Sequence, residues 1–128
     1  MKYLIDTHTL LWSAGNSPRL SSKVKKIYLN PNNDIYLSLA SIWELSIKIG
    51  LNKINLSIPL KKFVDIHILG NNIEILNINL NHIYRIEKLP LHHRDPFDRL
   101  IISQAIEENL PIIGNDKIFD NYKIKRIW

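Results

Sequence analysis

The sequence LHHRDPFDRLIISQA, residues 91–105, is the stretch around which the rest of the chain is organised. Asp95 followed by Pro96 predicts a helix start, because aspartate caps free backbone N–H groups and proline at the first helical position lacks only a donor that would be unpaired. The residues that follow form a broad apolar stripe at helical spacing: Phe97, Leu100, Ile101, Ile102, Ala105 and Ile106. Asp98 lies at the top of this stripe, so we expect its carboxylate to lean inward, where it is costly unless a cation or donors meet it.

Length and composition indicate one globular domain spanning residues 1–128. Hydrophobic content of 45% and charged content of 23% are ordinary for a folded domain of this size. The chain has no cysteine, which excludes disulfides and Cys-ligated zinc and favours a reducing compartment. No apolar run approaches the ~20 residues of a membrane span, and the first run meets Asp6 too early for a signal peptide. We therefore expect a cytoplasmic protein with no membrane partner.

The net charge of +5 suits a polyanionic partner such as nucleic acid. The basic residues are scattered, however, and no block of five occurs. Ile, Asn and Lys are abundant and all have AT-rich codons, so genome composition accounts for part of the lysines. The charge therefore permits a nucleic-acid substrate without establishing one.

Apolar runs and breakers predict alternating strands and helices along the chain. The expected strands cover residues 2–5, 35–37, 73–78, 111–113 and 122–128. The expected helices cover residues 7–13, the segment around Val24, Ile27 and Tyr28, and residues 39–49, 59–69, 80–88 and those after 95. This alternation predicts an α/β domain with a mainly parallel sheet. Ligands of such sheets bind outside the carboxyl ends of the strands, where Asp6 and Asp116 follow the first and fourth predicted strands.

Four acidic residues stand in unusual contexts, and each has an ordinary structural explanation. Asp6 interrupts two apolar runs but would also cap the next helix. The negative charge of Asp98 would interact favourably with the helix dipole, although Asp95 already serves as the cap. Asp116 would suit a turn. Two acids at strand ends and two on inward helix faces are nevertheless harder to explain together than singly.

Glu44 is the fourth acid, and its orientation depends on where its helix begins. A capping box from Ser41 to Glu44 would leave only a short helix before Gly50, whereas a start after Ser38 places Glu44 in the middle of the helix, facing inward. We favour the longer helix. Lys48, one turn later, is expected to pair with Glu44, the alternative being contact with a phosphate.

Clustered carboxylates repel one another, which raises their pKa values unless cations lie among them. Hard divalent ions with oxygen ligands, Mg²⁺ or Mn²⁺, are the natural partners. Metals held by carboxylates with open positions suit phosphodiester hydrolysis. The sequence thus favours a metal-dependent hydrolase.

Other chemical motifs are weak. The histidines lack the paired spacing of a zinc site, and residues 92–94 are expected to form a solvated loop. Trp12, Trp43 and Trp128 are expected in the core. No P-loop, GxGxxG or G-x-S-x-G is present.

At the acidic residues the chain resembles the PIN-domain family, and within it the VapC-like toxins of bacterial type II toxin–antitoxin systems. The resemblance spans the whole chain, and its four segments occur in the family's order: LIDTHTLLW around Asp6, SIWELSIK around Glu44, LPLHHRDPFDRLIISQA around Asp98 and NDKIFDNY around Asp116. HRDPFDR is a specific signal, whereas the other three segments would be weak alone.

The resemblance implies a three-layer α/β/α fold with an acidic quartet that binds Mg²⁺ or Mn²⁺ and supports endoribonucleolytic cleavage. Asp6 and Asp98 would be the central metal ligands, with Asp116 and Glu44 completing the catalytic site directly or through water. Attack by an activated water would leave 5′-phosphate and 3′-hydroxyl ends. Relatives usually form homodimers and are inhibited by a cognate antitoxin whose tail enters the acidic groove. Beside the acids, Lys48 and Arg99 are our candidates for contacts to the RNA phosphates.

One position departs from the family. Relatives commonly carry Thr or Ser two residues before the last acid, where this chain has Gly114. A hydroxyl that would orient water is therefore missing, and this weakens the prediction of the fine geometry rather than that of the metal site.

Three alternative functions stay open. The chain could be a PIN nuclease with a housekeeping RNA-processing or DNA role, or a binding module that keeps the fold with little catalysis, an option that Gly114 leaves open. A phosphoryl-transfer domain is a third class. A haloacid-dehalogenase-like site needs a second Asp at the position of His8, and a receiver needs an acidic pair that is absent.

Overall fold

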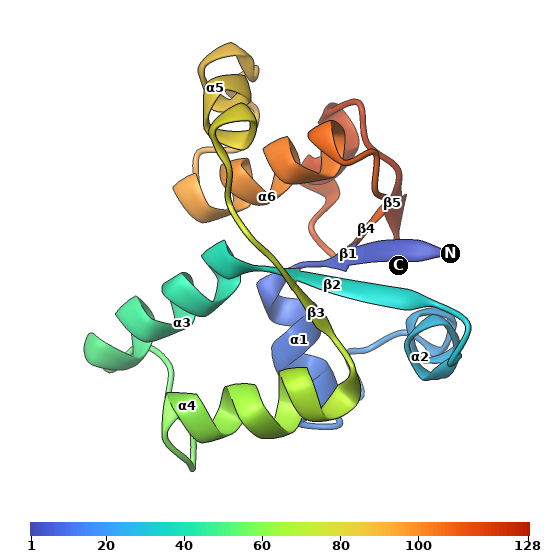
Figure 1. Cartoon of the computed structure of the whole chain (residues 1–128), viewed down its shortest axis with the longest axis vertical. Coiled ribbons are helices and arrows are strands. Elements are labelled where there is room, and N and C mark those ends of the chain that lie inside the picture. Colours follow the sequence, from blue (N-terminus) through green and yellow to red (C-terminus); the bar gives the residue numbers. More distant parts are fainter.

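The computed structural model, which describes residues 1–128, has five parallel strands in one sheet with six α-helices around it (Figure 1). The strands are β1 (Lys2–Ile5), β2 (Asp34–Ser38), β3 (Glu74–Leu76), β4 (Ile112–Ile113) and β5 (Arg126–Ile127), in the order β3-β2-β1-β4-β5. The helices are α1 (Thr7–Ala14), α2 (Ser22–Leu29), α3 (Leu39–Gly50), α4 (Leu60–Phe63), α5 (Leu80–Lys88) and α6 (Pro96–Glu107). The predicted α/β fold is confirmed, and every strand pair is parallel.

The sheet separates two apolar clusters, because successive side chains of a strand point to opposite faces. Leu4 of β1 packs with Ile101 and Ile102 of α6, whereas Ile5 packs with Leu10 of α1 on the other side. In Figure 1, α5 and α6 lie above the sheet, and α1, α2 and α4 lie below it. Strands covered on both faces explain the continuous apolar runs of the sequence.

The order of the strands determines where a ligand site can form. The chain builds outward from β1 to β2 and β3, then returns to the other side of β1 with β4 and β5. The connections therefore diverge between β1 and β4, and crevices at such points are the usual ligand sites of parallel sheets. Asp6 directly follows β1, and Asp116 lies three residues after β4.

The predicted helix starts are confirmed. Asp95 caps α6 by accepting hydrogen bonds from the backbone N–H groups of Phe97 (2.9 Å) and Asp98 (3.0 Å). Ser38 caps α3 through the N–H of Ala40, so the longer version of this helix is correct.

Three predicted elements are wrong in part. The expected helix over residues 59–69 has only one α-helical turn, α4, followed by a π-helical turn (Val64–Ile68) and a 3-10 turn (Leu69–Asn71). Three of the five π-helical residues are β-branched, and such side chains fit an α-helix less well. The third strand is shorter than expected, and the fifth begins only at Arg126.

The late start of β5 has a clear cause in Tyr122. Its hydroxyl accepts a hydrogen bond from the N–H of His93 (2.8 Å) and donates one to the carbonyl of Pro90 (2.7 Å). This residue therefore anchors the loop before α6 instead of extending the sheet.

None of the helices combines the length and the apolar character that a membrane crossing requires.

Candidate active site

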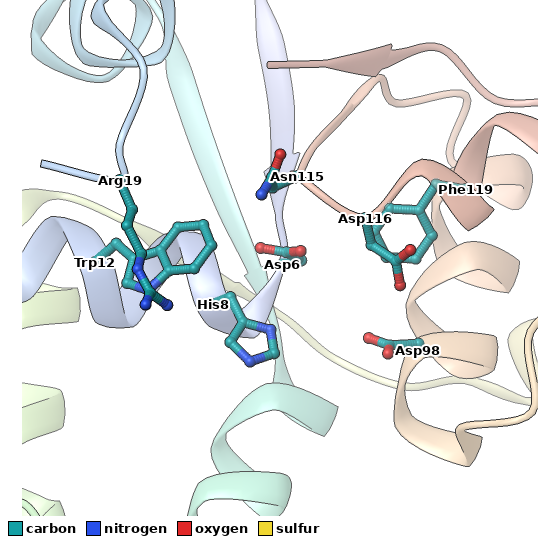
Figure 2. Close-up of a pocket in the computed structure, with 8 residues that line it drawn as sticks. All are labelled: Asp6, His8, Trp12, Arg19, Asp98, Asn115, Asp116 and Phe119. Carbon is teal, nitrogen blue, oxygen red and sulfur yellow. The ribbon is translucent and has the colours of Figure 1, made fainter. Parts of the chain in front are cut away.

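Three of the four predicted acids line one cavity of about 310 Å³ at the carboxyl ends of β1 and β4 (Figure 2). Asp6 comes from the end of β1, Asp98 from the first turn of α6, and Asp116 from the segment after β4. The other residues lining this cavity are His8, Trp12, Arg19, Asn115 and Phe119. The topology thus brings together carboxylates that are up to 110 residues apart in the sequence.

Asp6 and Asp116 each use one carboxylate oxygen to hold their own position. Oδ1 of Asp6 caps α1 by accepting from the N–H (2.8 Å) and the hydroxyl (2.6 Å) of Thr9. Oδ1 of Asp116 accepts from the N–H of Ile118 (3.0 Å) at the start of the 3-10 turn Lys117–Asn121. The ordinary capping and turn explanations are therefore correct. Oδ2 of Asp6 has no hydrogen-bond partner, whereas Oδ2 of Asp116 lies 2.9 Å from Nε2 of His93.

The acids are poorly compensated by positive charge. Burial raises the pKa of Asp98 to about 8, with further contributions from the negative charges of Asp95, Glu44, Asp6 and Asp116. Burial also raises the pKa of Asp6, against the opposing effect of the two Thr9 hydrogen bonds. The cluster therefore resists full ionisation in the absence of a cation.

Glu44 is buried beside the cavity and is held by neighbours on two helices. Its Oε1 accepts a hydrogen bond from the Thr7 hydroxyl (2.7 Å), and Thr7 also contacts the hydroxyl of Ser41 (2.9 Å). Its Oε2 pairs with Nζ of Lys48 at 2.7 Å, and this hydrogen bond raises the pKa of the lysine. The expected Glu44–Lys48 pairing is confirmed. Glu44 acts on Asp98 through its charge rather than by lining the cavity.

Arg99 is engaged in a structural role. Its guanidinium donates hydrogen bonds to the backbone carbonyls of Ile86, Leu89, Pro90 and His93, at 3.1–3.3 Å. These bonds tie the end of α5 and the following loop to α6. Contact of Arg99 with a phosphate stays a prediction, but most of its donors already have partners.

His93 is the residue that the sequence interpretation missed. It was expected in a solvated loop, but it is only 8% exposed, which corrects that expectation. Its Nε2 lies 2.9 Å from Oδ2 of Asp116 and 3.1 Å from Oδ2 of Asp98. The N–H of Asp95 donates to Nδ1 (3.2 Å), so Nδ1 carries no proton and Nε2–H is the donor to both carboxylates. The HH pair directly before RDPFD was the only sequence signal for this contact.

The tryptophans divide between two environments. Trp12 and Trp128 pack against the apolar cluster below the sheet, as expected. Trp43 is 56% exposed and contacts Phe97 edge-on, so its assignment to the core was wrong. It lies on α3 and meets only the ring of Phe97 in the first turn of α6, so about half of the indole stays exposed.

Gly114 has a steric role that its place in the family pattern did not reveal. A Cβ at this position would lie 2.7 Å from Oδ2 of Asp6 and 3.0 Å from the ring of Phe119. Oδ2 of Asp6 therefore packs against the Gly114 backbone, in space that any side chain at this position would need.

The donor set fits a hard divalent cation. One oxygen each from Asp98 and Asp116 lie within 4.8 Å of each other, and the Nε2–H of His93 holds both in place. Oδ2 of Asp6 accepts no hydrogen bond, and Asp6 lines the same cavity as Asp98 and Asp116. Oxygen ligands and uncompensated negative charge are what Mg²⁺ and Mn²⁺ require.

Comparison with known proteins agrees with this geometry. No curated protein matches the sequence. Among solved structures, a chain of VapBC2 from Rickettsia felis, bound to a DNA fragment from its promoter, superimposes with a TM-score of 0.74 at 20% identity, covering 99% of this chain and 98% of that one. VapBC-1 from nontypeable Haemophilus influenzae gives 0.69 at 20% identity (99% and 97%), and a toxin–antitoxin complex from Klebsiella pneumoniae gives 0.63 at 19% (98% and 96%). These likenesses show a shared fold.

The family itself is shown by sequence. The model of the PIN domain matches residues 3–125, from the first strand to the residue before the last strand, and so includes all four acids. The chain therefore belongs to the PIN-domain family.

Proposed function

We propose that this protein is a metal-dependent endoribonuclease and the toxin of a toxin–antitoxin pair. The observation that carries the proposal is the convergence of Asp6, Asp98 and Asp116 on one cavity, with the pKa of Asp98 raised to about 8 by burial and by neighbouring acids. The hydrogen bonds from Thr9 and His93 leave the negative charge of these acids without a cationic partner. Membership of the PIN-domain family supports the nuclease assignment.

In this proposal the carboxylates of Asp6, Asp98 and Asp116 hold Mg²⁺ or Mn²⁺, and buried Glu44 adds negative charge from one side. When bound, the ion would supply positive charge at the scissile phosphate and lower the pKa of a water molecule. The Thr9 hydrogen bonds keep Asp6 in one orientation, leaving Oδ2 available.

His93 serves as a positioning residue in the same scheme. Its Nε2–H holds Asp98 and Asp116 at a fixed separation, although the two acids come from different elements. Outer hydrogen bonds of this kind orient the carboxylates that bind metals.

The proposed partners are RNA as substrate, a second copy of the chain, and an antitoxin protein, all in the cytoplasm. Structural neighbours were crystallised as toxin–antitoxin complexes, which supports the antitoxin. A small protein with a DNA-binding N-terminus, encoded beside this chain, is the partner to co-express. Formation of a complex that suppresses cleavage would support the toxin role, and a lack of binding would contradict it.

The nuclease is tested by incubating the purified chain with a structured RNA in Mg²⁺ or Mn²⁺, and then with EDTA. Cleavage is expected only with metal, and Mn²⁺ should raise the melting temperature because it binds the folded state alone. Asp116→Asn should lose both the cleavage and the rise in melting temperature with Mn²⁺. Asp120→Asn is the matched control, since Asp120 lies nearby but pairs with Arg126. Cleavage that persists in EDTA would contradict the metal mechanism. Preference for DNA over RNA would overturn the assignment as a ribonuclease.

A further inference from the structure

Arg19 is the one arginine that lines the acidic cavity, and it has no partner there. Arg85 and Arg126 pair with carboxylates, and Arg99 binds carbonyls. Arg19 is exposed, forms no side-chain hydrogen bond or ion pair, and lies with its guanidinium carbon 5.9 Å from the centre of the Trp12 ring. A free cation therefore stands at the opposite side of the cavity from Asp98 and Asp116, as Figure 2 shows.

The same side of the cavity has an aromatic wall. The rings of His8 and Trp12 are 5.7 Å apart at an interplanar angle of 39°, and Trp128 supports Trp12 edge-on at 5.5 Å. Trp12 is half-buried, so part of the indole faces the cavity. Aromatic surface beside a cation is the combination that binds single-stranded nucleic acid, because bases stack on the rings while the cation meets the backbone.

We propose that His8, Trp12 and Arg19 form a subsite for the nucleotide next to the scissile phosphate. Arg19 binds the phosphate of that nucleotide, and the rings of Trp12 and His8 contact its base. This inference rests on the proposed ribonuclease function, and it adds the position of one nucleotide of the substrate. A volume of about 310 Å³ for the whole cavity is at the lower end of small-molecule sites and suits one nucleotide.

The subsite also answers an electrostatic difficulty. The acids repel RNA, and the two cations first considered for phosphate contact are engaged, Lys48 with Glu44 and Arg99 with carbonyls. Arg19 supplies positive charge that does not depend on the metal ligands. Stacking on Trp12 adds affinity with little preference among the four bases.

Binding of a short, labelled single-stranded RNA is measured by fluorescence anisotropy in Ca²⁺ over a range of salt. Arg19→Ala should weaken binding roughly tenfold and make the log–log salt slope shallower by about 0.7, the contribution of one phosphate contact. Arg94→Ala is the matched control, because Arg94 is also exposed but lies outside the cavity. Arg94→Ala should leave the RNA affinity and the salt slope unchanged.

The base contact is tested with adenosine monophosphate and inorganic phosphate as separate probes. The nucleotide should quench the indole fluorescence, and phosphate alone should not. Trp12→Phe should abolish the quenching, whereas Trp43→Phe, which changes an exposed indole on α3, should keep it. Equal effects of the two probes, or quenching that survives Trp12→Phe, would overturn the base contact.

Two failures are distinguishable. If the unaltered protein neither binds Mn²⁺ nor cleaves RNA, the proposed function fails. If it does both and Arg19→Ala binds RNA with the original affinity and salt slope, the subsite alone is wrong. The subsite is equally overturned if Arg19→Ala and the more conservative Arg19→Gln leave RNA binding intact but prevent capture of the antitoxin, because the cavity side is then a protein contact.

Discussion

Replacing Asp98 with Asn should stabilise the metal-free protein while abolishing cleavage. The change keeps the shape of the side chain and an oxygen that can accept from His93, but it removes a carboxyl group whose ionisation is opposed by burial and by the neighbouring acids. Asp98 has an ordinary pKa of 3.8 when unfolded and a pKa of about 8 when folded. Between these values the unfolded state has lost a proton that the folded state retains, so the free energy of unfolding falls as pH rises.

The size of the effect follows from this pKa difference. At ~1.4 kcal/mol per pH unit, the interval of about 3.5 units from pH 4 to pH 7.5 sets an upper limit of about 5 kcal/mol. The Asp98 side chain is 25% exposed, and solvent ions screen the cluster. We therefore expect the variant to be more stable by about 1–2 kcal/mol at pH 7.5, or about 3–8 °C in melting temperature. The difference should shrink toward pH 4 and vanish below about pH 3, where Asp98 is protonated in both states.

The assay is thermal melting of both proteins in EDTA from pH 4 to pH 8, followed by single-turnover cleavage in Mg²⁺. Asp120→Asn is the control with the opposite sign, because the hydrogen bond from Arg126 lowers the pKa of Asp120. Cleavage by Asp98→Asn should collapse, since a neutral amide is a weak ligand for a hard cation. If Asp98→Asn melts earlier than the unaltered protein at pH 7.5 and cleaves normally, Asp98 is a structural group and the acidic-site interpretation is wrong.

Three further substitutions separate structure from chemistry. Asp95→Ala removes the cap of α6 and should lower the free energy of unfolding by ~1 kcal/mol while cleavage per folded molecule persists. A loss of cleavage at an unchanged melting temperature would contradict this expectation. Arg99→Lys keeps the charge but not the planar group that reaches four carbonyls, so denaturant titration should show the free energy of unfolding lowered by about 2 kcal/mol. Unchanged stability together with weaker RNA binding would favour the phosphate contact instead. Gly114→Ser brings this position to the family's usual residue type, yet it should cost about 1–3 kcal/mol and weaken Mn²⁺ binding measured by calorimetry, and a gain in cleavage would show that Asp6 can move aside.

Features that depend on neighbours a few residues away were predictable from the sequence. The start of α6 at Asp95 and Pro96 and the start of α3 after Ser38 follow from capping, which joins a side chain to a backbone N–H two or three positions later. Buried apolar runs alternating with amphipathic segments predicted the parallel sheet. The place of Asp6 at the carboxyl edge of the sheet was predictable because it follows the first such run.

The tertiary structure alone decided which side chains meet in the cavity. His93 reaches Asp116 because Tyr122 and Arg99 hold the loop before α6, through contacts that cross up to 32 residues. The same packing decided that Arg99 is engaged and Arg19 is free, although the two have identical chemistry in the sequence.

Gly114 shows most directly the difference between what the sequence reveals and what the tertiary structure decides. The sequence could reveal only that a hydroxyl is absent. That Asp6 and Phe119 approach closely enough to leave no room for a Cβ depends on β1 lying beside β4, and this pairing joins segments more than 100 residues apart. Hydrogen bonds between near neighbours are specified by local residue order, whereas the contacts that build this site exist only once the whole sheet has assembled.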